Sequence, residues 1–186
     1  MFNANFQTLA ELCSSGKSGS FFYYTSDGKF LLKTISRNEF KFLKGILKNY
    51  HTYLTNDNPE SLISKVYGLH KMIFYRKKGK MSKKVYFSIM NNVFNTQRKI
   101  DYRYDLKGST QGREVKITAG QEPDSTIAMK DNDFTRRREK FKIGPDIKKR
   151  LMDTIQKDAM FFAKNDIIDY SLLVGVNVKP AHQHFS

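Results

Sequence analysis

The stretch "SGKSGSFFYYTSDGKFLLKTI", residues 15–35, decides the fold of the first part of the chain. Two apolar runs, residues 21–25 and 30–35, stand on either side of "SDGK". An Asp-Gly pair between two such runs is a strong signal for a hairpin turn. The segment therefore predicts an antiparallel β-hairpin that follows a glycine- and serine-rich loop.

An amphipathic helix is expected directly after this hairpin. Ser36 and Glu39 fit a capping box, in which each side chain accepts from the backbone N–H of the other residue. Apolar residues then recur at spacings of three and four, as they do along one face of a helix. The pattern predicts a helix over residues 37–54 that ends before Pro59. Its apolar face would carry Phe40, Leu43, Ile46, Leu47, Tyr50 and Leu54.

A second hairpin is expected in the middle of the chain. The apolar runs at residues 65–75 and 83–94 flank the basic segment "RKKGKMS" and should pair around it as a charged tip. Further along, residues 114–135 contain Glu122, Pro123 and Asp124 and have the composition of a flexible insertion.

The last part of the chain predicts a helix and then a strand. Gly144 and Pro145 mark the start of a helix that should end near Asn165. Its apolar face would consist of Ile147, Leu151, Ile155, Ala159 and Phe162. The following "DYSLLVGVNV" predicts a short loop that carries Asp169, and then a strand of the buried type.

The charge of the chain is its strongest bulk feature. The 33 Lys and Arg residues against 18 Asp and Glu give a net charge of +15, which predicts a polyanionic partner. An anionic lipid surface and a nucleic acid both fit. The two densest basic runs, residues 76–84 and 136–142, lack the interleaved aromatic residues of a single-strand nucleic-acid reader. Either run is also compatible with a solvated turn or helix face.

Several classes of protein are excluded by composition. No apolar run approaches the roughly 20 residues that a membrane-spanning helix needs, and the first ten residues lack the order of a signal peptide. The single cysteine, Cys13, cannot form an internal disulfide, and the four histidines lack zinc-ligand spacing. We therefore expect a cytosolic protein without a structural metal.

The segment "YDLKGSTQGR", residues 104–113, is a candidate phosphate site. Lys107 and Arg113 supply positive charge, and the glycines Gly108 and Gly112 would let the backbone approach an anion. The same ten residues also fit a surface turn that is capped by Asp105. The segment alone leaves both interpretations open.

The first hairpin and its loop suggest a nucleotide-binding site similar to that of protein kinases. A Walker-type loop is excluded, because Glu11 stands where that motif requires a glycine. In protein kinases, a flexible strand-turn-strand covers the ATP phosphates and a strand lysine binds them; here that lysine would be Lys33. The chain has no His-Arg-Asp loop and no Gly-x-Gly-x-x-Gly loop, so an ordinary turn and a solvated Lys33 remain alternatives.

Taken together, these segments resemble the phosphatidylinositol-phosphate kinases, which phosphorylate the inositol headgroup of a lipid. The residues that carry the resemblance are "SGKSGSFFYYTSDGKFLLKTI", "EFKFL", "YGLHK", "IMNNVF", "RYDLKGSTQGR" and "DYSLLVGV", in that order. "DLKGS" and "DYSLL" are highly specific to the family. The resemblance covers almost the whole chain and is weakest over residues 114–145.

The resemblance implies a fold and a set of residue roles. The fold would be α+β, related to protein kinases, ATP-grasp enzymes and SAICAR synthase, with an antiparallel sheet and packed helices. Asp169 resembles the catalytic aspartate, and Lys107 and Arg113 would lie near the transferred phosphate or the headgroup. ATP would be bound by a covering loop, a strand lysine and a hinge against adenine, namely Gly16, Ser18, Gly19, Ser20, Lys33, Met90, Asn91 and Asn92.

The resemblance also implies partners and an incomplete site. The substrate would be phosphatidylinositol 4-phosphate, with ATP and Mg²⁺ as cofactors, at the cytoplasmic face of a membrane; a homodimer would be compatible with this. Residues 1–186 would form the N-terminal lobe and the start of the C-terminal lobe. The family's second metal-binding aspartate and activation loop, which follow the "DYSLL" strand, do not occur in these residues. We therefore expect little activity from this chain alone.

Two other classes of function remain open at the level of the sequence. A kinase-like module could bind phosphoinositides at a membrane without catalysis, and would then bind the headgroup but not ATP. A basic nucleic-acid-binding domain is favoured only by the net charge, and would show steeply salt-dependent binding without preference for phosphoinositide vesicles.

Overall fold

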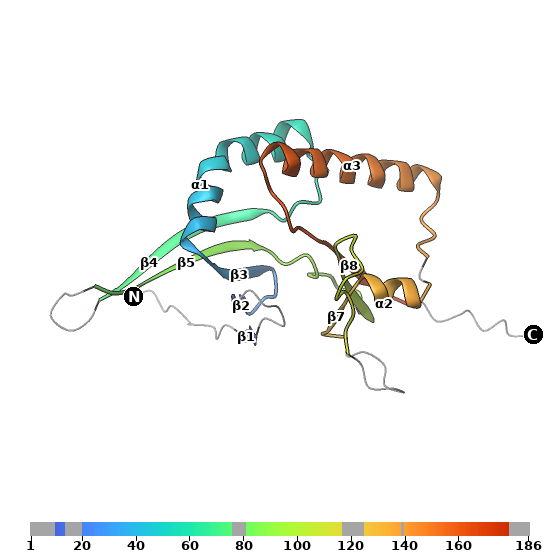
Figure 1. The fold of residues 1–186 in the computed structure, drawn as a ribbon, viewed down its shortest axis with the longest axis horizontal. Coiled ribbons are helices and arrows are strands. Elements are labelled where there is room, and N and C mark those ends of the chain that lie inside the picture. The colour runs from blue at the N-terminus through green and yellow to red at the C-terminus, as the bar shows by residue number, and fades with distance from the viewer. Residues whose placement is uncertain (1–9, 14–19, 76–80, 117–124, 139, 179–186) are drawn as a thin grey trace, which may run out of the picture. The chain divides into compact units, whose positions relative to one another are not determined.

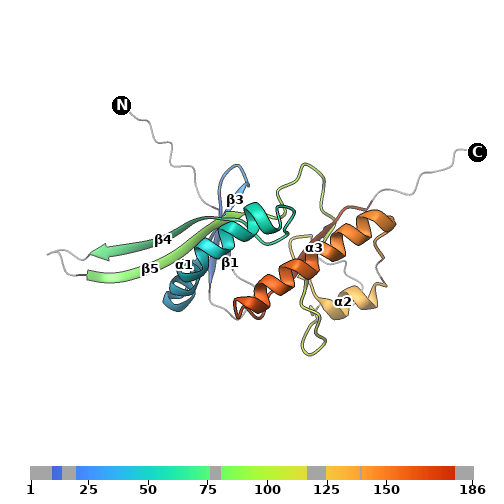
Figure 2. The ribbon, with the colours of Figure 1, turned by 90° about the horizontal axis from the view of Figure 1, so that it is seen from above.

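The computed structural model describes residues 10–13, 20–75, 81–116, 125–138 and 140–178. The chain divides into two compact units (Figures 1 and 2). The first unit comprises residues 1–95 and 152–161, and the second comprises residues 96–151 and 162–186. Both units combine helices with mainly antiparallel strands, which confirms the predicted α+β class.

The first unit contains an antiparallel sheet with strand order β1-β2-β3-β5-β4. Both predicted hairpins are confirmed, although the described part of the chain excludes the tip of the second one. Tyr24 and Phe30 flank the first turn, which closes through a hydrogen bond from Gly28 N to Thr25 O of 2.8 Å. The strands are β1 (Ala10–Cys13), β2 (Phe21–Tyr24), β3 (Phe30–Ile35), β4 (Val66–Tyr75) and β5 (Met81–Asn91).

Helix α1 (Arg37–Thr52) begins with the predicted capping box. Glu39 N donates to Ser36 Oγ at 3.1 Å, and Ser36 N donates to Glu39 Oε2 at 2.6 Å. After Thr52 the backbone continues as one π-helical turn, Tyr53–Asp57, so helical structure extends past the predicted end at residue 54.

One face of α1 packs toward the β4–β5 hairpin, above which it lies in Figure 1. The rings of Phe40 and Tyr86 are 4.9 Å apart between centroids. Tyr50 joins the helix to the start of β4, because its hydroxyl donates to Ser64 O and accepts from Val66 N. The predicted apolar face is half-buried except at Leu47, which is exposed.

Helix α3 (Pro145–Lys164) confirms the second predicted helix. Its predicted apolar face is half-buried from Leu151 onward, whereas Ile147 is exposed. The most deeply buried positions include the polar residues Thr154 and Asp158 beside Phe161. The apolar spacing in the sequence did not predict that Thr154 and Asp158 would be buried.

The carboxylate of Asp158 is a buried hydrogen-bond acceptor in the first unit. Its Oδ1 accepts from Tyr53 Oη at 2.6 Å, Asn58 Nδ2 at 3.0 Å and Ser61 Oγ at 2.7 Å, and its Oδ2 accepts from Leu62 N at 2.8 Å. Burial and the donation to Asp158 raise the pKa of Tyr53 to about 12. A buried carboxylate is tolerated only when its oxygens are satisfied in this way.

The second unit contains a sheet with strand order β7-β6-β8. Strand β6 (Tyr102–Leu106) pairs parallel with β7 (Ala128–Met129) and antiparallel with β8 (Leu172–Val176). Tyr104 and Met129 are fully buried. Helix α2 (Asp131–Arg136) contacts this core through Phe134, whose ring lies edge-on to Tyr104 at 5.2 Å.

Two sequence predictions fail in the second unit. Residues 114–135 are not wholly a flexible insertion, because β7 and most of α2 lie within them; residues 117–124 lie outside the described part of the chain. The closing strand β8 is not of the buried type: Leu172 and Leu173 are 39% and 42% exposed. Among the described strands β8 pairs only with β6, so it is an edge strand.

None of the described helices combines the length and apolar character that crossing a bilayer requires.

We predict that Asp158→Asn lowers the free energy of unfolding by about 3 kcal/mol, because the amide cannot accept from all four donors and leaves some of them unsatisfied. Urea denaturation measures this change. Asp153→Asn is the matched control, since Asp153 is an exposed carboxylate on the same helix. Equal stabilities of the two variants would contradict a structural role for the Asp158 network.

Candidate functional site

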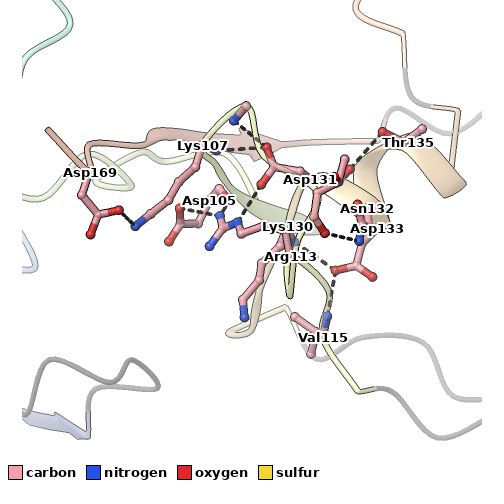
Figure 3. Close-up of polar contacts among 12 residues, drawn as sticks. Asp105, Lys107, Arg113, Val115, Lys130, Asp131, Asn132, Asp133, Thr135 and Asp169 are labelled. Carbon is pink, nitrogen blue, oxygen red and sulfur yellow. Dashed lines mark hydrogen bonds and ion pairs between the residues drawn. The ribbon is translucent and has the colours of Figure 1, made fainter.

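The candidate site lies at one end of the β6–β8 pair in the second unit. Leu106 is opposite Leu172 in the ladder, so Lys107, which follows β6, comes near the loop that precedes β8. Asp169 lies in that loop, and Lys107 Nζ donates to Asp169 Oδ1 (Figure 3). The structure thus brings together two residues that are 62 positions apart in the sequence.

The two members of this pair differ in exposure. The Lys107 side chain is 27% exposed, whereas that of Asp169 is 77% exposed. The hydrogen bond from Lys107, its positive charge and that of Arg113 together lower the pKa of Asp169. Asp169 is therefore ionised at neutral pH and presents an open carboxylate oxygen to solvent.

Asp169 also adopts a left-handed backbone conformation, with φ of 60°. Such values are uncommon outside glycine, although Asp and Asn tolerate them best. Asp166, three residues earlier in the same loop, has φ of 54°. At either position, a substitution to Asn therefore preserves the left-handed backbone conformation better than a substitution to Ala does.

Arg113 is held by two carboxylates in the same unit. Its Nε donates to Asp131 Oδ2 at 2.8 Å, and its Nη2 donates to the main-chain oxygen and to Oδ1 of Asp105. Only 14% of its side chain is exposed. Burial opposes the charge of Arg113, but the two carboxylates outweigh it and raise the pKa of the guanidinium.

The loop between Lys107 and Arg113 is fixed by Asp131 at the start of α2. Asp131 Oδ1 accepts from Lys107 N at 3.0 Å and from Gly108 N at 2.8 Å. Gly108 and Gly112 both have positive φ, 71° and 65°, which explains why the tight loop carries glycine at these positions. The turn is capped through Asp131, and Asp105 contributes by accepting from Arg113.

A cavity of about 430 Å³ opens at this cluster. Its lining combines two cations, one carboxylate, a hydroxyl and an aromatic ring, namely Lys107, Arg113, Asp169, Ser109 and Tyr170. The three catalytic residues predicted from the sequence thus line one cavity. This composition suits a polar ligand that carries both hydroxyl groups and negative charge.

Lys33, the predicted ATP lysine, lies on β3 in the first unit. It is half-buried, and its Nζ is 5.8 Å from the centroid of the Phe22 ring on β2. Among the described residues no carboxylate lies within ion-pair distance of Lys33, although its charge contributes to the lowered pKa of Glu39. Glu39 is instead occupied by its capping box.

The predicted hinge residues lie at the end of β5. Met90 is opposite Leu31 on β3, and Asn91 Oδ1 accepts from Lys65 N at 2.7 Å. Asn92 Nδ2 donates to Gly28 O at 2.8 Å and so ties the segment to the first hairpin turn. Ser20 immediately precedes β2, whereas Gly16, Ser18 and Gly19 lie outside the described residues.

Comparison with known proteins shows the family to which the chain belongs. The family model for phosphatidylinositol-4-phosphate 5-kinase matches residues 3–186. The chain belongs to the phosphatidylinositol-4-phosphate 5-kinase family. It is 42% identical over 179 residues to a phosphatidylinositol 4-phosphate 5-kinase of Plasmodium falciparum, a match that covers 96% of this chain and 10% of that relative.

Other members of the family are similar over the same part. A phosphatidylinositol 4-phosphate 5-kinase of Schizosaccharomyces pombe is 42% identical over 91% of this chain and 22% of its own length. A probable phosphatidylinositol phosphate kinase of Dictyostelium discoideum is 40% identical over 91% of this chain and 22% of its own length. The chain therefore spans between a tenth and about a fifth of the length of these relatives.

Sequence reasoning did not identify Asp131 as part of the site of this family member. A signal was present, since "KDNDF" places Asp and Asn immediately before an apolar residue, which is typical of a helix start. Lys130 at the N-cap offers no side-chain acceptor, and its N–H donates to Asp133 Oδ2 at 3.0 Å instead.

The described residues do not by themselves form a magnesium site. Mg²⁺ prefers octahedral coordination by oxygen atoms. Asp105 and Asp131 are engaged by Arg113, which leaves Asp169 as the one open carboxylate lining the cavity, and it is paired with Lys107. No described group of three or more His, Cys, Asp or Glu residues is arranged to hold a metal.

We predict that Lys107→Met raises the pKa of Asp169 toward its ordinary value, because the substitution removes the hydrogen bond and the charge that favour the ionised form. Titration of the Asp169 carboxyl carbon by NMR measures this pKa. Lys116→Met, which removes an exposed lysine not paired with Asp169, should leave the value unchanged. An unaltered pKa in Lys107→Met would show that the two side chains do not pair in solution.

Proposed function

We propose that the protein containing this chain is a lipid kinase that transfers the γ-phosphate of ATP to phosphatidylinositol 4-phosphate and forms phosphatidylinositol 4,5-bisphosphate. The relatives that are phosphatidylinositol 4-phosphate 5-kinases by name support this substrate. The observation that carries the proposal is the Lys107–Asp169 pair, with Arg113, at an open cavity. Phosphoryl transfer requires mainly a positioned hydroxyl and compensation of developing negative charge.

Asp169 orients the acceptor hydroxyl of the inositol ring. Its carboxylate is ionised and 77% exposed, so it can accept a hydrogen bond from that hydroxyl. The hydroxyl oxygen then attacks the γ-phosphorus of ATP while the bond to the β-phosphate breaks. Because Lys107 lowers the pKa of Asp169, the main contribution of the carboxylate is orientation, and its uptake of the proton accompanies late stages of the transfer.

Lys107 supplies positive charge to the transferred phosphate. It is the less constrained of the two cavity cations, since its side chain has one ion-pair partner among the described residues whereas Arg113 has two. When the inositol hydroxyl donates a hydrogen bond to Asp169, the ammonium group of Lys107 can turn toward the phosphate oxygens. Arg113 shapes the loop and contributes its charge from a fixed position.

ATP is bound by residues of the first unit in this proposal. Lys33 would hold the phosphates, because it is a half-buried lysine on β3 whose ammonium lies over the Phe22 ring and forms no close ion pair among the described residues. The fold would then be of the protein-kinase-like type, with Met90, Asn91 and Asn92 against the adenine and Ser20 in the covering loop. Mg²⁺ would supply charge compensation when bound with ATP.

The lipid substrate places the reaction at an anionic membrane surface. The net charge of +15 favours such a surface, since each Lys or Arg near an anionic leaflet contributes on the order of 1 kcal/mol. Lys83 and Lys84 are exposed on β5, next to the basic segment of residues 76–80. The protein would therefore be peripheral at the cytoplasmic face of a membrane.

We predict that Asp169→Asn lowers kcat by about a hundredfold or more while ATP binding stays within about twofold, because the amide keeps the left-handed backbone but loses the acceptor charge. The assay is radiolabelled phosphate incorporation into vesicles that contain phosphatidylinositol 4-phosphate, with the full-length protein in which this chain occurs. Asp166→Asn, in the same loop and conformation, is the matched control. Full activity of Asp169→Asn would exclude a catalytic role.

We predict that Lys33→Met weakens ATP binding by about tenfold or more, because the substitution keeps the apolar stem and removes the charge that meets the phosphates. Isothermal titration with Mg·ATP measures the affinity. Lys29→Met is the control, because Lys29 is an exposed lysine of the same hairpin that lies near Asp27. If both variants bind ATP equally well, Lys33 is only a solvated strand residue.

A further inference from the structure

The first two residues of α2 hold the loop that carries Lys107 and Arg113. Asp131 accepts from Lys107 N, Gly108 N and Arg113 Nε at 3.0, 2.8 and 2.8 Å (Figure 3). Asn132 N donates to Arg113 O at 2.9 Å, and its Nδ2 donates to Thr110 O at 2.9 Å. The loop is therefore fastened at both ends and in the middle to one short segment.

The carboxyl group of Asp131 is largely enclosed and yet ionised. Its side chain is 14% exposed. Burial by itself would raise its pKa, but the hydrogen bonds from Arg113, Gly108 and Lys107 outweigh burial and hold the pKa below its usual value. The carboxylate is thus ionised and acts as an anion inside the loop.

The Asp131 carboxylate occupies hydrogen-bond donors of the loop that could otherwise bind a ligand. The sequence predicted that Gly108 and Gly112 would let the backbone approach an anion; in the structure, the backbone amides of Lys107 and Gly108 donate to Asp131. The side chain of Lys107 points the other way, to Asp169 (Figure 3). These two amides are therefore not available to a phosphate, whereas the side chain of Lys107 lines the cavity.

We propose that Asp131 is a positioning residue for phosphoryl transfer: it fixes the backbone from which Lys107 reaches Asp169 and sets the orientation of Arg113, without touching the substrate. The proposal rests on the proposed function of the cavity. It gives α2, part of a segment whose composition suggested a flexible insertion, an influence on the reacting groups that acts through Lys107 and Arg113.

Asp133 provides a matched control on the same helix. It is buried, and its Oδ2 accepts from Val115 N and Lys130 N at 3.0 Å each. It is therefore also a buried carboxylate that accepts from two backbone amides, but it makes no hydrogen bond to Lys107 or Arg113 in the described structure. Loss of Asp133 should destabilise the unit without displacing the Lys107–Asp169 pair.

The first experiment compares Asp131→Asn with Asp133→Asn by NMR titration of Asp169, at a temperature where both variants are folded. Removing the negative charge of Asp131 would, by electrostatics alone, lower the pKa of Asp169. Releasing Lys107 from its position would raise that pKa, because the hydrogen bond and charge that depress it are lost. We expect a rise in Asp131→Asn and no change in Asp133→Asn. A fall or no change in Asp131→Asn overturns the proposal.

The second experiment measures kinase activity of the same variants in the full-length protein, with vesicles that contain phosphatidylinositol 4-phosphate. Asp131→Asn should lower kcat by about tenfold or more with an unchanged KM for ATP, and Asp131→Glu should recover part of the loss. Asp133→Asn should stay within about twofold. An active parent protein with unchanged kcat in Asp131→Asn contradicts the proposal. An inactive parent protein would contradict the proposed function, and the Asp169 titration would then decide the role of Asp131.

Asp131→Glu serves if Asp131→Asn does not fold. This variant keeps the negative charge but moves the carboxylate by one methylene, so it cannot keep all three hydrogen bonds to Lys107 N, Gly108 N and Arg113 Nε at their present lengths. Lys107 should then pair less well with Asp169, which raises the pKa of Asp169, and kcat should fall by about threefold. A folded Asp131→Glu variant that matches the parent protein in both measurements overturns the proposal.

Discussion

The carboxylate of Asp131 is the acceptor on which the candidate site depends. Three donors converge on it, two from the backbone after β6 and one from Arg113. A largely buried charge is stable only when its hydrogen bonds are satisfied, so the loop cannot change shape without exposing or unpairing this group. That constraint fixes the backbone position of Lys107. It thereby determines from where the Lys107 side chain reaches Asp169.

The balance of charge at the site differs from that of the whole chain. Asp105, Asp131 and Asp169 oppose Lys107 and Arg113, so the cluster has one more negative than positive group. The excess of +15 therefore resides elsewhere in the chain, where it suits attraction to an anionic surface. Under the proposed function, long-range attraction and local chemistry would thus be assigned to different residues, and the substrate would meet two cations that carboxylates already position.

The first unit also contains a carboxylate that accepts several hydrogen bonds. Asp158 on α3 accepts from Tyr53, Asn58, Ser61 and the backbone of Leu62, and so ties the helix to the segment that leads into β4. In both units one largely enclosed carboxylate accepts from several donors, most of which belong to a segment outside the regular helices and strands. Such acceptors hold irregular backbone, which hydrophobic contacts alone define poorly because they have no direction.

The sequence by itself determined the local elements and the family. The Asp-Gly turn, the Ser36–Glu39 capping box and the apolar spacings predicted both hairpins and both long helices, because these signals act between residues close in the chain. The tertiary structure decided which polar groups meet: Asp131 lies 23 residues from Gly108, and Asp158 lies 96 residues from Leu62. The edge position of β8, likewise, follows from strand order and not from its apolar composition. No periodicity encodes such pairings, since they arise only when distant segments are packed together.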